Sequence, residues 1–297
     1  MGPSLRRRVS HVITTDYDRV SRVWDRTFVP ATDGIRHAIL AMAALQPGEE
    51  VLDVGTGTGA AALLATRRVG RTGRVLGIDV SSAMLAKARA KASRSGLTNV
   101  TFRRMDGGAL RLPRASLDVI VSSFGTPEGL YDGEAVFRDW LRVLRPGGRL
   151  CFAESPGLTS FYKILRRVLE KHKVKDPSPA LAARRRLWEQ GREERRCTPT
   201  ISGDEPGKVV RLLRAAGFRG VRVTHRRSSV LLPSVRTILR LFLLWDMADE
   251  YAEMRPKVRA AFRRDLLRAL RRYETPDGVR LPTQTNFFFG RKGTRPT

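Results

Sequence analysis

The 297-residue chain is poor in the residue types that build disulfides, metal sites and membrane spans. It has two cysteines, Cys151 and Cys197, and four histidines, and none of them has the spacing of a disulfide framework or a metal site. No uninterrupted apolar run approaches the ~20 residues of a membrane-spanning helix, and the arginines at 6–8 are not followed by the apolar segment of a signal peptide. We therefore expect a cytoplasmic globular protein with reduced cysteines, no transmembrane segment and no metal.

Acidic residues are also scarce: the chain has 29 Asp and Glu but 56 Lys and Arg, which gives a formal net charge of +27. A basic excess of this size is typical of proteins that bind nucleic acid or an anionic membrane. Arginine supplies 47 of the 56 basic residues, however, and the excess is spread over both halves of the chain. This spread favours an arginine-rich composition over a dedicated groove, and it leaves an RNA partner as the alternative.

The most informative local pattern is a short apolar run that ends in three glycines, Val51-Leu52-Asp53-Val54-Gly55-Thr56-Gly57-Thr58-Gly59. The run leads directly into the small residues at 60–64, so we predict a buried strand that turns sharply into a helix. Glycine has no Cβ and the first amides of a helix are free, which together suit a nucleotide-like ligand.

Two classes of ligand fit this spacing. Gly55, Gly57 and Ala60 satisfy the dinucleotide fingerprint in its Gly/Ala form, and Asp79, after the next expected strand, can hold a ribose diol. The acid Asp53 within the strand and the third glycine favour S-adenosylmethionine over NAD.

Apolar strand-like segments alternate with helical ones along most of the chain. Strands are expected at 51–55, 74–80, 99–104, 117–122, 149–154, 219–225 and 285–290. Helices are expected at 58–69, from Ser81 or Ser82 onward, at 131–144 and at 206–216. This order predicts an α/β protein with a doubly wound, mainly parallel seven-stranded sheet whose ligands lie at the carboxyl ends of the strands.

Helical segments before and within this pattern predict a lid and a cap. The expected parts are a lid at 1–48, a core at 49–157, 201–230 and 280–292, and cap insertions at 158–200 and 231–279. Tyr17 and Trp24 of the lid are candidates to cover the ligand. The segment 241–245 is apolar on all faces, so Phe242 and Trp245 are candidate substrate contacts in the cap.

Over residues 17 to 155 the motifs resemble those of the class I S-adenosylmethionine-dependent methyltransferases, and they come in the family order. They are 51–59, Gly77-Ile78-Asp79-Val80-Ser81 with Met84, Met105-Asp106-Gly107, 117–125 and 141–150. The motif Ser123-Phe124-Gly125 and the general spacing are similar to those of the family branch that methylates ubiquinone and menaquinone precursors. That branch continues with Leu-Arg-Asn, where this chain has Thr126-Pro127-Glu128-Gly129.

The resemblance implies a Rossmann-like methyltransferase fold, the cofactor S-adenosyl-L-methionine and the product S-adenosyl-L-homocysteine. It places Asp53 and the glycine turn on the methionine part of the cofactor, Asp79 on the ribose, Asp106 and Gly107 on the adenine, and the serines after the fourth strand beside the sulfonium. The implied cofactor-binding set is Asp53, Gly55, Thr56, Gly57, Thr58, Gly59, Asp79, Val80, Ser81, Met84, Asp106, Gly107, Ser122, Ser123 and Phe124.

A sulfonium methyl is already a strong electrophile, so rate comes from holding the acceptor in line in a site without water. A base helps when the acceptor must lose a proton, and Glu154 at the end of the fifth strand is the best placed, ahead of His11, Asp246 and Glu250. We expect methyl transfer to carbon or oxygen of a small or medium, largely apolar acceptor by a biosynthetic enzyme, as a monomer or homo-oligomer. The alternatives are an RNA methyltransferase and a non-catalytic binding protein that keeps the cofactor fold.

Overall fold

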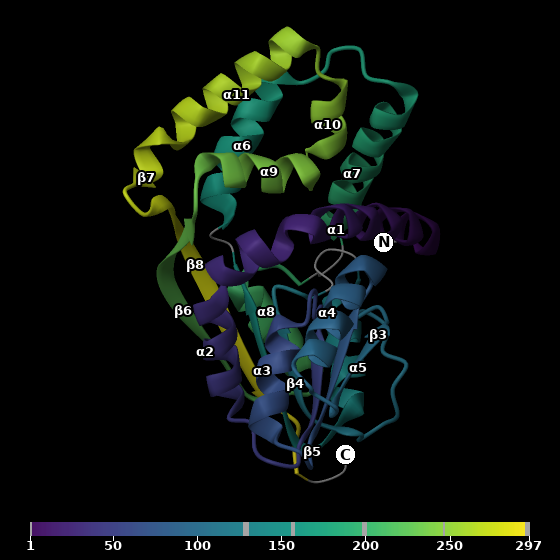
Figure 1. Ribbon diagram of the computed structural model, residues 1–297. Helices are drawn as coiled ribbons and strands as arrows, with labels where there is room; N and C mark the ends of the chain where they lie inside the picture. The colour runs from purple at the N-terminus through teal and green to yellow at the C-terminus, as the bar shows by residue number, and fades with distance from the viewer. Residues whose placement is uncertain (1, 127–130, 156–157, 198–200, 246, 295–297) are drawn as a thin grey trace.

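A single twisted sheet forms the centre of the protein in the computed structural model (Figure 1), which describes residues 2–126, 131–155, 158–197, 201–245 and 247–294. The strand order is β3-β2-β1-β4-β5-β8-β6, and a two-residue strand, β7, pairs with β8. The strands are β1 Glu50–Val54, β2 Arg74–Asp79, β3 Val100–Arg104, β4 Leu117–Ser123, β5 Leu144–Glu154, β6 Arg219–Leu232, β7 Glu274–Thr275 and β8 Gly278–Arg291. β1 to β5 are parallel, while β8 is antiparallel to both β5 and β6. The predicted α/β class and doubly wound, mainly parallel sheet are confirmed.

Helices cover both faces of this sheet, as a parallel sheet requires. The helices are α1 Pro3–Ala31, α2 Asp33–Ala43, α3 Ala60–Val69, α4 Ser82–Arg94, α5 Gly133–Val143, α6 Leu158–His172, α7 Pro179–Cys197, α8 Pro206–Ala215, α9 Val235–Leu244, α10 Ala248–Glu253 and α11 Pro256–Leu270. Among the described residues, no helix is both long and apolar enough to cross a membrane.

Alternation along the strands produces two separate cores. Leu52, Ile120 and Phe152 point to the face that α5 and α8 cover, whereas Val51 and Val119 point to the face covered by α2, α3 and α4. Successive side chains of a strand point to opposite faces, so the near-continuous apolar runs seen in the sequence serve both cores. The two layers hold the carboxyl ends of β1, β2, β4 and β5 at one edge of the sheet.

A third core lies beyond this edge, between α1 and the cap helices. Figure 1 shows α1 crossing the upper end of the sheet, with α6, α7, α9, α10 and α11 above it. Val20 and Val23 of α1 pack in one cluster with Ile238 of α9 and Phe262 of α11. The lid helix and the cap therefore share one apolar core.

The antiparallel arm β6–β8 is longer than the sequence indicated. We expected strands at 219–225 and 285–290, which is wrong: the two strands stay paired out to Leu232 and Val279. The added segment of β6, Arg226-Arg227-Ser228-Ser229, is exposed and polar, and it lacks the alternation that marks a strand, because β6 is an edge strand. The predicted core boundary at 230 thus falls within β6, and the arm supports the cap.

Gly55 is required by a close backbone contact, and its replacement gives a first prediction. Its φ is +66° and a Cβ there would lie 2.4 Å from Cα of Gly125, so Gly55→Ala adds a clash to left-handed strain. Gly96 is the matched control because it has a similar φ of +61° and nothing within 4 Å. We expect Gly96→Ala to lower the free energy of unfolding by about 1 kcal/mol and Gly55→Ala by at least about 3 kcal/mol, measured by urea denaturation. Equal losses would contradict the steric account.

Candidate active site

A cavity of about 510 Å³ lies at the carboxyl edge of the sheet, under α1 and the cap. Its walls come from the ends of β1, β2, β4 and β5, from α1 and α2, from the cap residues Trp188 and Trp245, and from Gly203 and Asp204 before α8. This is the switch point of the doubly wound sheet, where β1 separates β2 from β4 and where ligands of such folds bind. Among the residues described, no group of three or more His, Cys, Asp or Glu side chains is placed to hold a metal ion.

The polar end of the cavity is built by the turn after β1. Asp53 is buried and accepts a 2.6 Å hydrogen bond from the Thr56 hydroxyl. Asp79 accepts hydrogen bonds from the backbone amides of Gly57 at 2.8 Å and Ser81 at 2.9 Å. Burial raises the pKa of both carboxyls, that of Asp53 to about 7. Asp79 therefore joins the glycine turn to the start of α4.

Asp106 and Gly107 line the same cavity beside Met105. Oδ1 of Asp106 accepts from the Gly108 amide at 2.8 Å, and Oδ2 accepts from the Tyr131 hydroxyl. The sequence reasoning missed Tyr131, which contacts Asp106 across 25 residues and has no motif to mark it. Val80 and Met84 complete this side of the cavity.

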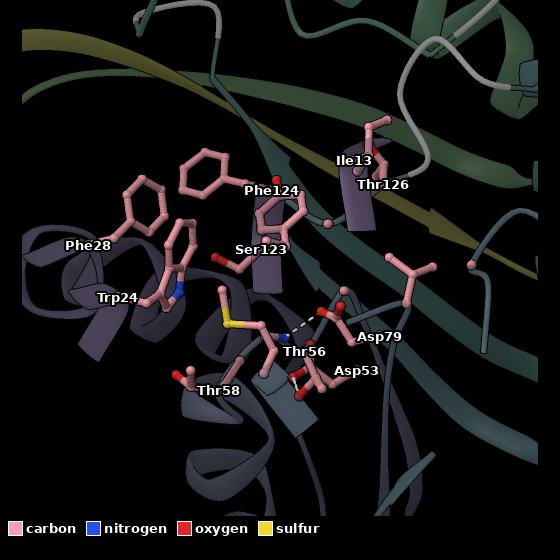
Figure 2. Close-up of a pocket in the computed structure, with 18 of the residues that line it drawn as sticks. Ile13, Trp24, Phe28, Asp53, Thr56, Thr58, Asp79, Ser123, Phe124 and Thr126 are labelled. Atoms are coloured by element: carbon pink, nitrogen blue, oxygen red, sulfur yellow. Dashed lines mark hydrogen bonds between the residues drawn. The ribbon is translucent and has the colours of Figure 1, made fainter. Parts of the chain in front are cut away.

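The opposite end of the cavity is aromatic. Figure 2 shows Trp24, Phe28 and Phe124 together, away from Asp53 and Asp79. The Trp24 and Phe28 rings stack with centroids 4.3 Å apart, and the Phe28 and Phe124 centroids are 6.2 Å apart. Of the substrate contacts expected from the sequence, Tyr17, Trp24 and Trp245 line this end, and the centroids of Tyr17 and Trp24 lie 5.6 and 5.8 Å from that of Trp245.

A small apolar annex of about 30 Å³ adjoins the aromatic end. It shares Phe28, Phe124 and Trp245 with the main cavity. Phe242 lines this annex and not the main cavity, together with Leu232 and Leu281 of the β6–β8 arm. The site thus continues from a polar end through aromatic walls into an aliphatic pocket.

Glu154 is the last residue of β5 and lines the cavity. The residue is 6% exposed, and its side chain accepts a hydrogen bond from the Thr126 hydroxyl. Thr126, Ser123 and Ser155 line the cavity as well. Of the bases expected from the sequence, Glu154 is therefore the one that the structure places at the cavity.

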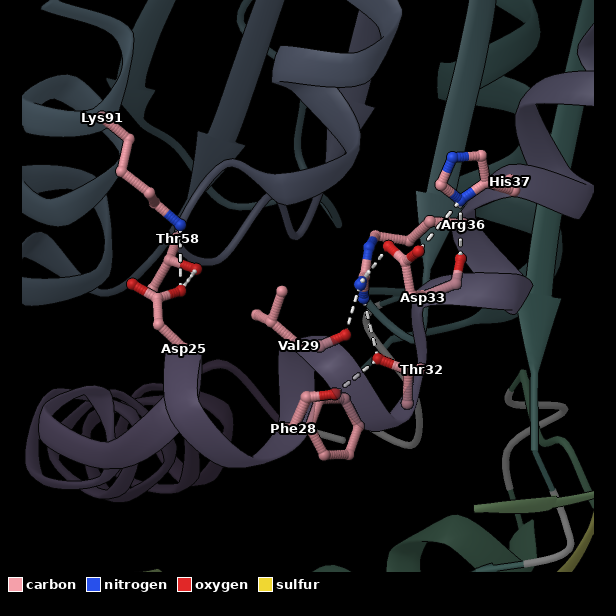
Figure 3. A network of polar contacts seen from close by, with 9 residues as sticks. All are labelled: Asp25, Phe28, Val29, Thr32, Asp33, Arg36, His37, Thr58 and Lys91. Atoms are coloured by element: carbon pink, nitrogen blue, oxygen red, sulfur yellow. Dashed lines mark hydrogen bonds and ion pairs between the residues drawn. The ribbon is translucent and has the colours of Figure 1, made fainter. Parts of the chain in front are cut away.

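The lid helix is tied directly to the cofactor turn. Figure 3 shows Lys91 and Thr58 meeting the carboxylate of Asp25 of α1. Asp25 pairs with Lys91 at 2.9 Å and accepts from the Thr58 hydroxyl. About two turns earlier in α1, Asp18 accepts from the Ser81 hydroxyl at the start of α4. These contacts hold α1 across the mouth of the cavity.

Arg36 of α2 is a second residue that the sequence reasoning missed. It is 5% exposed, lines the cavity and donates to the Thr32 hydroxyl at 2.8 Å and to the Val29 carbonyl (Figure 3). Its buried Nε has no hydrogen-bond partner among the described residues. An isolated arginine in an amphipathic helix carries no sequence signal, and only the fold brings it opposite Asp53.

Three residues of the predicted cofactor set, all within the described part of the chain, do not line the cavity. Gly59 faces Ala88 and Phe102, and its amide donates to Thr56. The Ser81 hydroxyl caps α4 by accepting from the Met84 amide. The Ser122 hydroxyl is buried and donates to the Val54 carbonyl at 2.9 Å. These three residues lie behind the walls of the site.

Two other residues considered as bases, His11 and Glu250, do not line the cavity. His11 is exposed on α1 and does not line it. Glu250 is bound by Arg185 at 2.6 Å and by the Val174 amide at 2.8 Å, and so it joins parts of the cap. Asp246, like positions 127–129, lies outside the described residues.

The sheet, the glycine turn and the acid after β2 define an α/β protein that binds a nucleoside cofactor. The family model of a methyltransferase domain matches residues 51–148. Nocamycin O-methyltransferase of Saccharothrix syringae is 30% identical over 268 residues, which are 86% of this chain and 89% of that protein. Demethylmenaquinone methyltransferase of Tropheryma whipplei is 39% identical over 143 residues, 46% of this chain and 56% of that protein.

A putative methyltransferase from Bacillus halodurans has a similar fold, with a TM-score of 0.54 and 17% identity over 87% of this chain and 99% of that chain. The chain belongs to the class I S-adenosylmethionine-dependent methyltransferases, as its motifs indicated. It is an enzyme that uses S-adenosylmethionine and acts on small molecules. The cavity fits this cofactor, because it offers a carboxylate beside a bare glycine turn and a buried guanidinium nitrogen that lacks a partner.

The raised pKa of Asp53 predicts a pH-dependent stability. The folded protein keeps the proton up to about pH 7, whereas the unfolded carboxyl loses it near its usual 3.8. Stability of the cofactor-free protein therefore falls as pH rises between these values, by an amount on the order of 4 kcal/mol. Urea denaturation of the wild type and Asp53→Asn across this range checks it, because the variant lacks this component. Parallel pH curves for the two proteins would contradict the assignment.

Proposed function

We propose that the enzyme methylates an oxygen or carbon atom of a small or medium, largely apolar and planar acceptor. The observation that carries the proposal is the change in wall chemistry from the carboxylates at the ends of β1 and β2 to the rings of Tyr17, Trp24, Phe28, Phe124 and Trp245. Aromatic walls favour apolar, conjugated ligands. The annex offers room for an aliphatic substituent.

In this proposal the cofactor supplies an activated methyl group, and the protein orients the acceptor and excludes water. Ser123 and Phe124 at the end of β4 lie where the polar and aromatic walls meet, which is where the acceptor atom is to be presented. Glu154 takes the proton that a hydroxyl or enol acceptor loses on methylation. The name of the relative that matches most of this chain, an O-methyltransferase, agrees with acceptor oxygen.

The N-terminal helices and the helical insertions take part in substrate binding in this proposal. Residues 1–48 act as a lid, because α1 is tied to the cofactor turn through Asp25 and to α4 through Asp18. The helices of 158–200 and the segment between β6 and β8 act as the cap, since Trp188 and Trp245 reach the cavity from there and Phe242 reaches its annex.

An acceptor survey tests the proposal. Labelled S-adenosylmethionine is incubated with the enzyme and with phenolic, enolic and quinol-type apolar compounds, and separately with total RNA. We expect transfer to members of the first group, and an increase of KM by about tenfold in Trp245→Ala, which removes one ring of the wall. Tyr273→Ala, which removes a cap ring outside both cavities, is the matched control. Transfer to RNA alone would overturn the proposal in favour of an RNA methyltransferase.

A further inference from the structure

A second hollow, of about 380 Å³, lies on the outer side of the lid and cap, away from the walls of the cofactor cavity. Its lining combines four arginines with aliphatic residues of α1, α9 and α11: Arg22, Val23, Arg236, Leu239, Arg240, Leu243, Leu244 and Arg263. We call this set the arginine cleft. All four arginines are exposed, and no acidic residue contributes to the lining.

Among the residues that the structure describes, no ion pair compensates the charge of the arginine cleft. None of its four arginines is paired there, and three acids of α1, α10 and α11 have other partners. Asp25 pairs with Lys91, Asp249 with Arg19 and Arg184, and Asp265 with Lys171 and His172. Four like charges around one hollow repel each other unless an anion is bound.

Exposed leucines beside the arginines of the cleft favour an anionic lipid layer over a free anion as the ligand of this surface. Leu243 and Leu244 of α9 remain partly exposed in the hollow. Leu267 of α11 is 44% exposed, and it lies one turn after Arg263, so both are on one face of that helix. Arginines that surround leucines on a helical surface are typical of proteins that lie on an anionic bilayer, where the guanidinium groups meet the headgroups.

The arginine cleft lies on helices that also reach the proposed acceptor site. Two of its three helices also reach the interior, since α1 presents Trp24 to the cavity and α9 presents Phe242 to the annex. We propose that the arginine cleft docks the enzyme on membranes that contain anionic phospholipid. The link to an apolar acceptor held in the lipid rests on the proposed function, but the docking surface itself does not.

Vesicle sedimentation of the full chain tests the docking surface. We expect binding to vesicles of phosphatidylcholine mixed with phosphatidylglycerol, little binding to phosphatidylcholine alone, and weakening of the former by salt. Each arginine near the surface contributes about fivefold in partitioning. Arg240→Gln is therefore expected to lower it about fivefold, and the quadruple variant Arg22→Gln, Arg236→Gln, Arg240→Gln, Arg263→Gln by more than about a hundredfold.

The control variant removes the same charge elsewhere. Arg71→Gln, Arg94→Gln, Arg103→Gln and Arg111→Gln change four exposed arginines of the core, and we expect a loss of less than about threefold. Retained binding of S-adenosylmethionine shows by calorimetry that each variant is folded. Equal losses in the two quadruple variants would overturn the proposal, because the net charge alone would explain them. Preference for RNA over the anionic vesicles, lost in the arginine-cleft variant, would also overturn it.

Discussion

Replacement of Asp79 by asparagine is expected to lower the affinity for S-adenosylmethionine by at least about a hundredfold. An ionised carboxylate accepts about four hydrogen bonds, and the amides of Gly57 and Ser81 use two of these positions. The other two suit the ribose hydroxyls that the family resemblance assigns to this residue. Hydrogen bonds to a charged group contribute about 1.5–3 kcal/mol each, and asparagine replaces one oxygen by a donor. Isothermal titration calorimetry measures the loss.

Asp118 provides a matched control for Asp79. It also accepts a backbone amide, that of Glu50 at 2.8 Å, and pairs with Arg145 at 2.6 Å, but it lies at the start of β4, at the opposite edge of the sheet. Asp118→Asn is expected to lower the free energy of unfolding by about 1 kcal/mol and to leave cofactor affinity unchanged. If both variants bind the cofactor like the wild type, Asp79 does not hold the ribose.

The parts of the site that follow β1 and β2 could be predicted from the sequence because they depend on local geometry. A buried strand that ends in Gly55 and Gly57 has few ways to turn, and the parallel neighbour ends at Asp79 on the same edge. The order of strands and helices along the chain is therefore sufficient to predict that Asp53 and Asp79 lie at the same cavity. The aromatic residues Tyr17 and Trp24 could be predicted for a related reason, since their spacing puts them on one face of α1.

The rest depends on tertiary contacts that leave no local signal. Ser81 and Ser122 were assigned to the cavity because they follow motif positions, but their hydroxyls turn into the protein to satisfy the Met84 amide and the Val54 carbonyl. Arg36 and Tyr131 reach the site from segments outside the motifs, so nothing in their neighbourhood marked them. The extension of β6 was missed because an exposed edge strand has no buried face to impose alternation.

Helix α1 connects the glycine turn to the aromatic end of the cavity. Thr58 belongs to this turn, and its hydroxyl donates to Asp25 of α1, the helix that also carries Trp24 and Phe28. These contacts follow from the tertiary packing of α1 against the sheet, so the sequence alone could not predict them.

Replacement of Glu154 by glutamine is expected to lower the turnover number by about a hundredfold or more while cofactor affinity stays within about twofold. The carboxylate is buried at the end of β5, lines the cavity and accepts a hydrogen bond from the Thr126 hydroxyl. Glutamine keeps the size and can still accept from Thr126, but it cannot take a proton. Single-turnover kinetics with saturating cofactor measures the effect, and Asp204→Asn, an exposed acid on the same cavity wall, is the matched control.

A series of acceptors of different acidity distinguishes two roles for Glu154: a base that takes a proton, and a residue that only packs against the acceptor. A base matters less as the acceptor hydroxyl becomes easier to ionise, so the defect of Glu154→Gln should shrink along a series of phenols of falling pKa and nearly vanish for those ionised at the assay pH. A residue that only packs against the acceptor gives the same defect along the whole series. A constant defect, or full activity of the variant with weakly acidic phenols, would therefore remove Glu154 from proton transfer and leave catalysis to orientation alone.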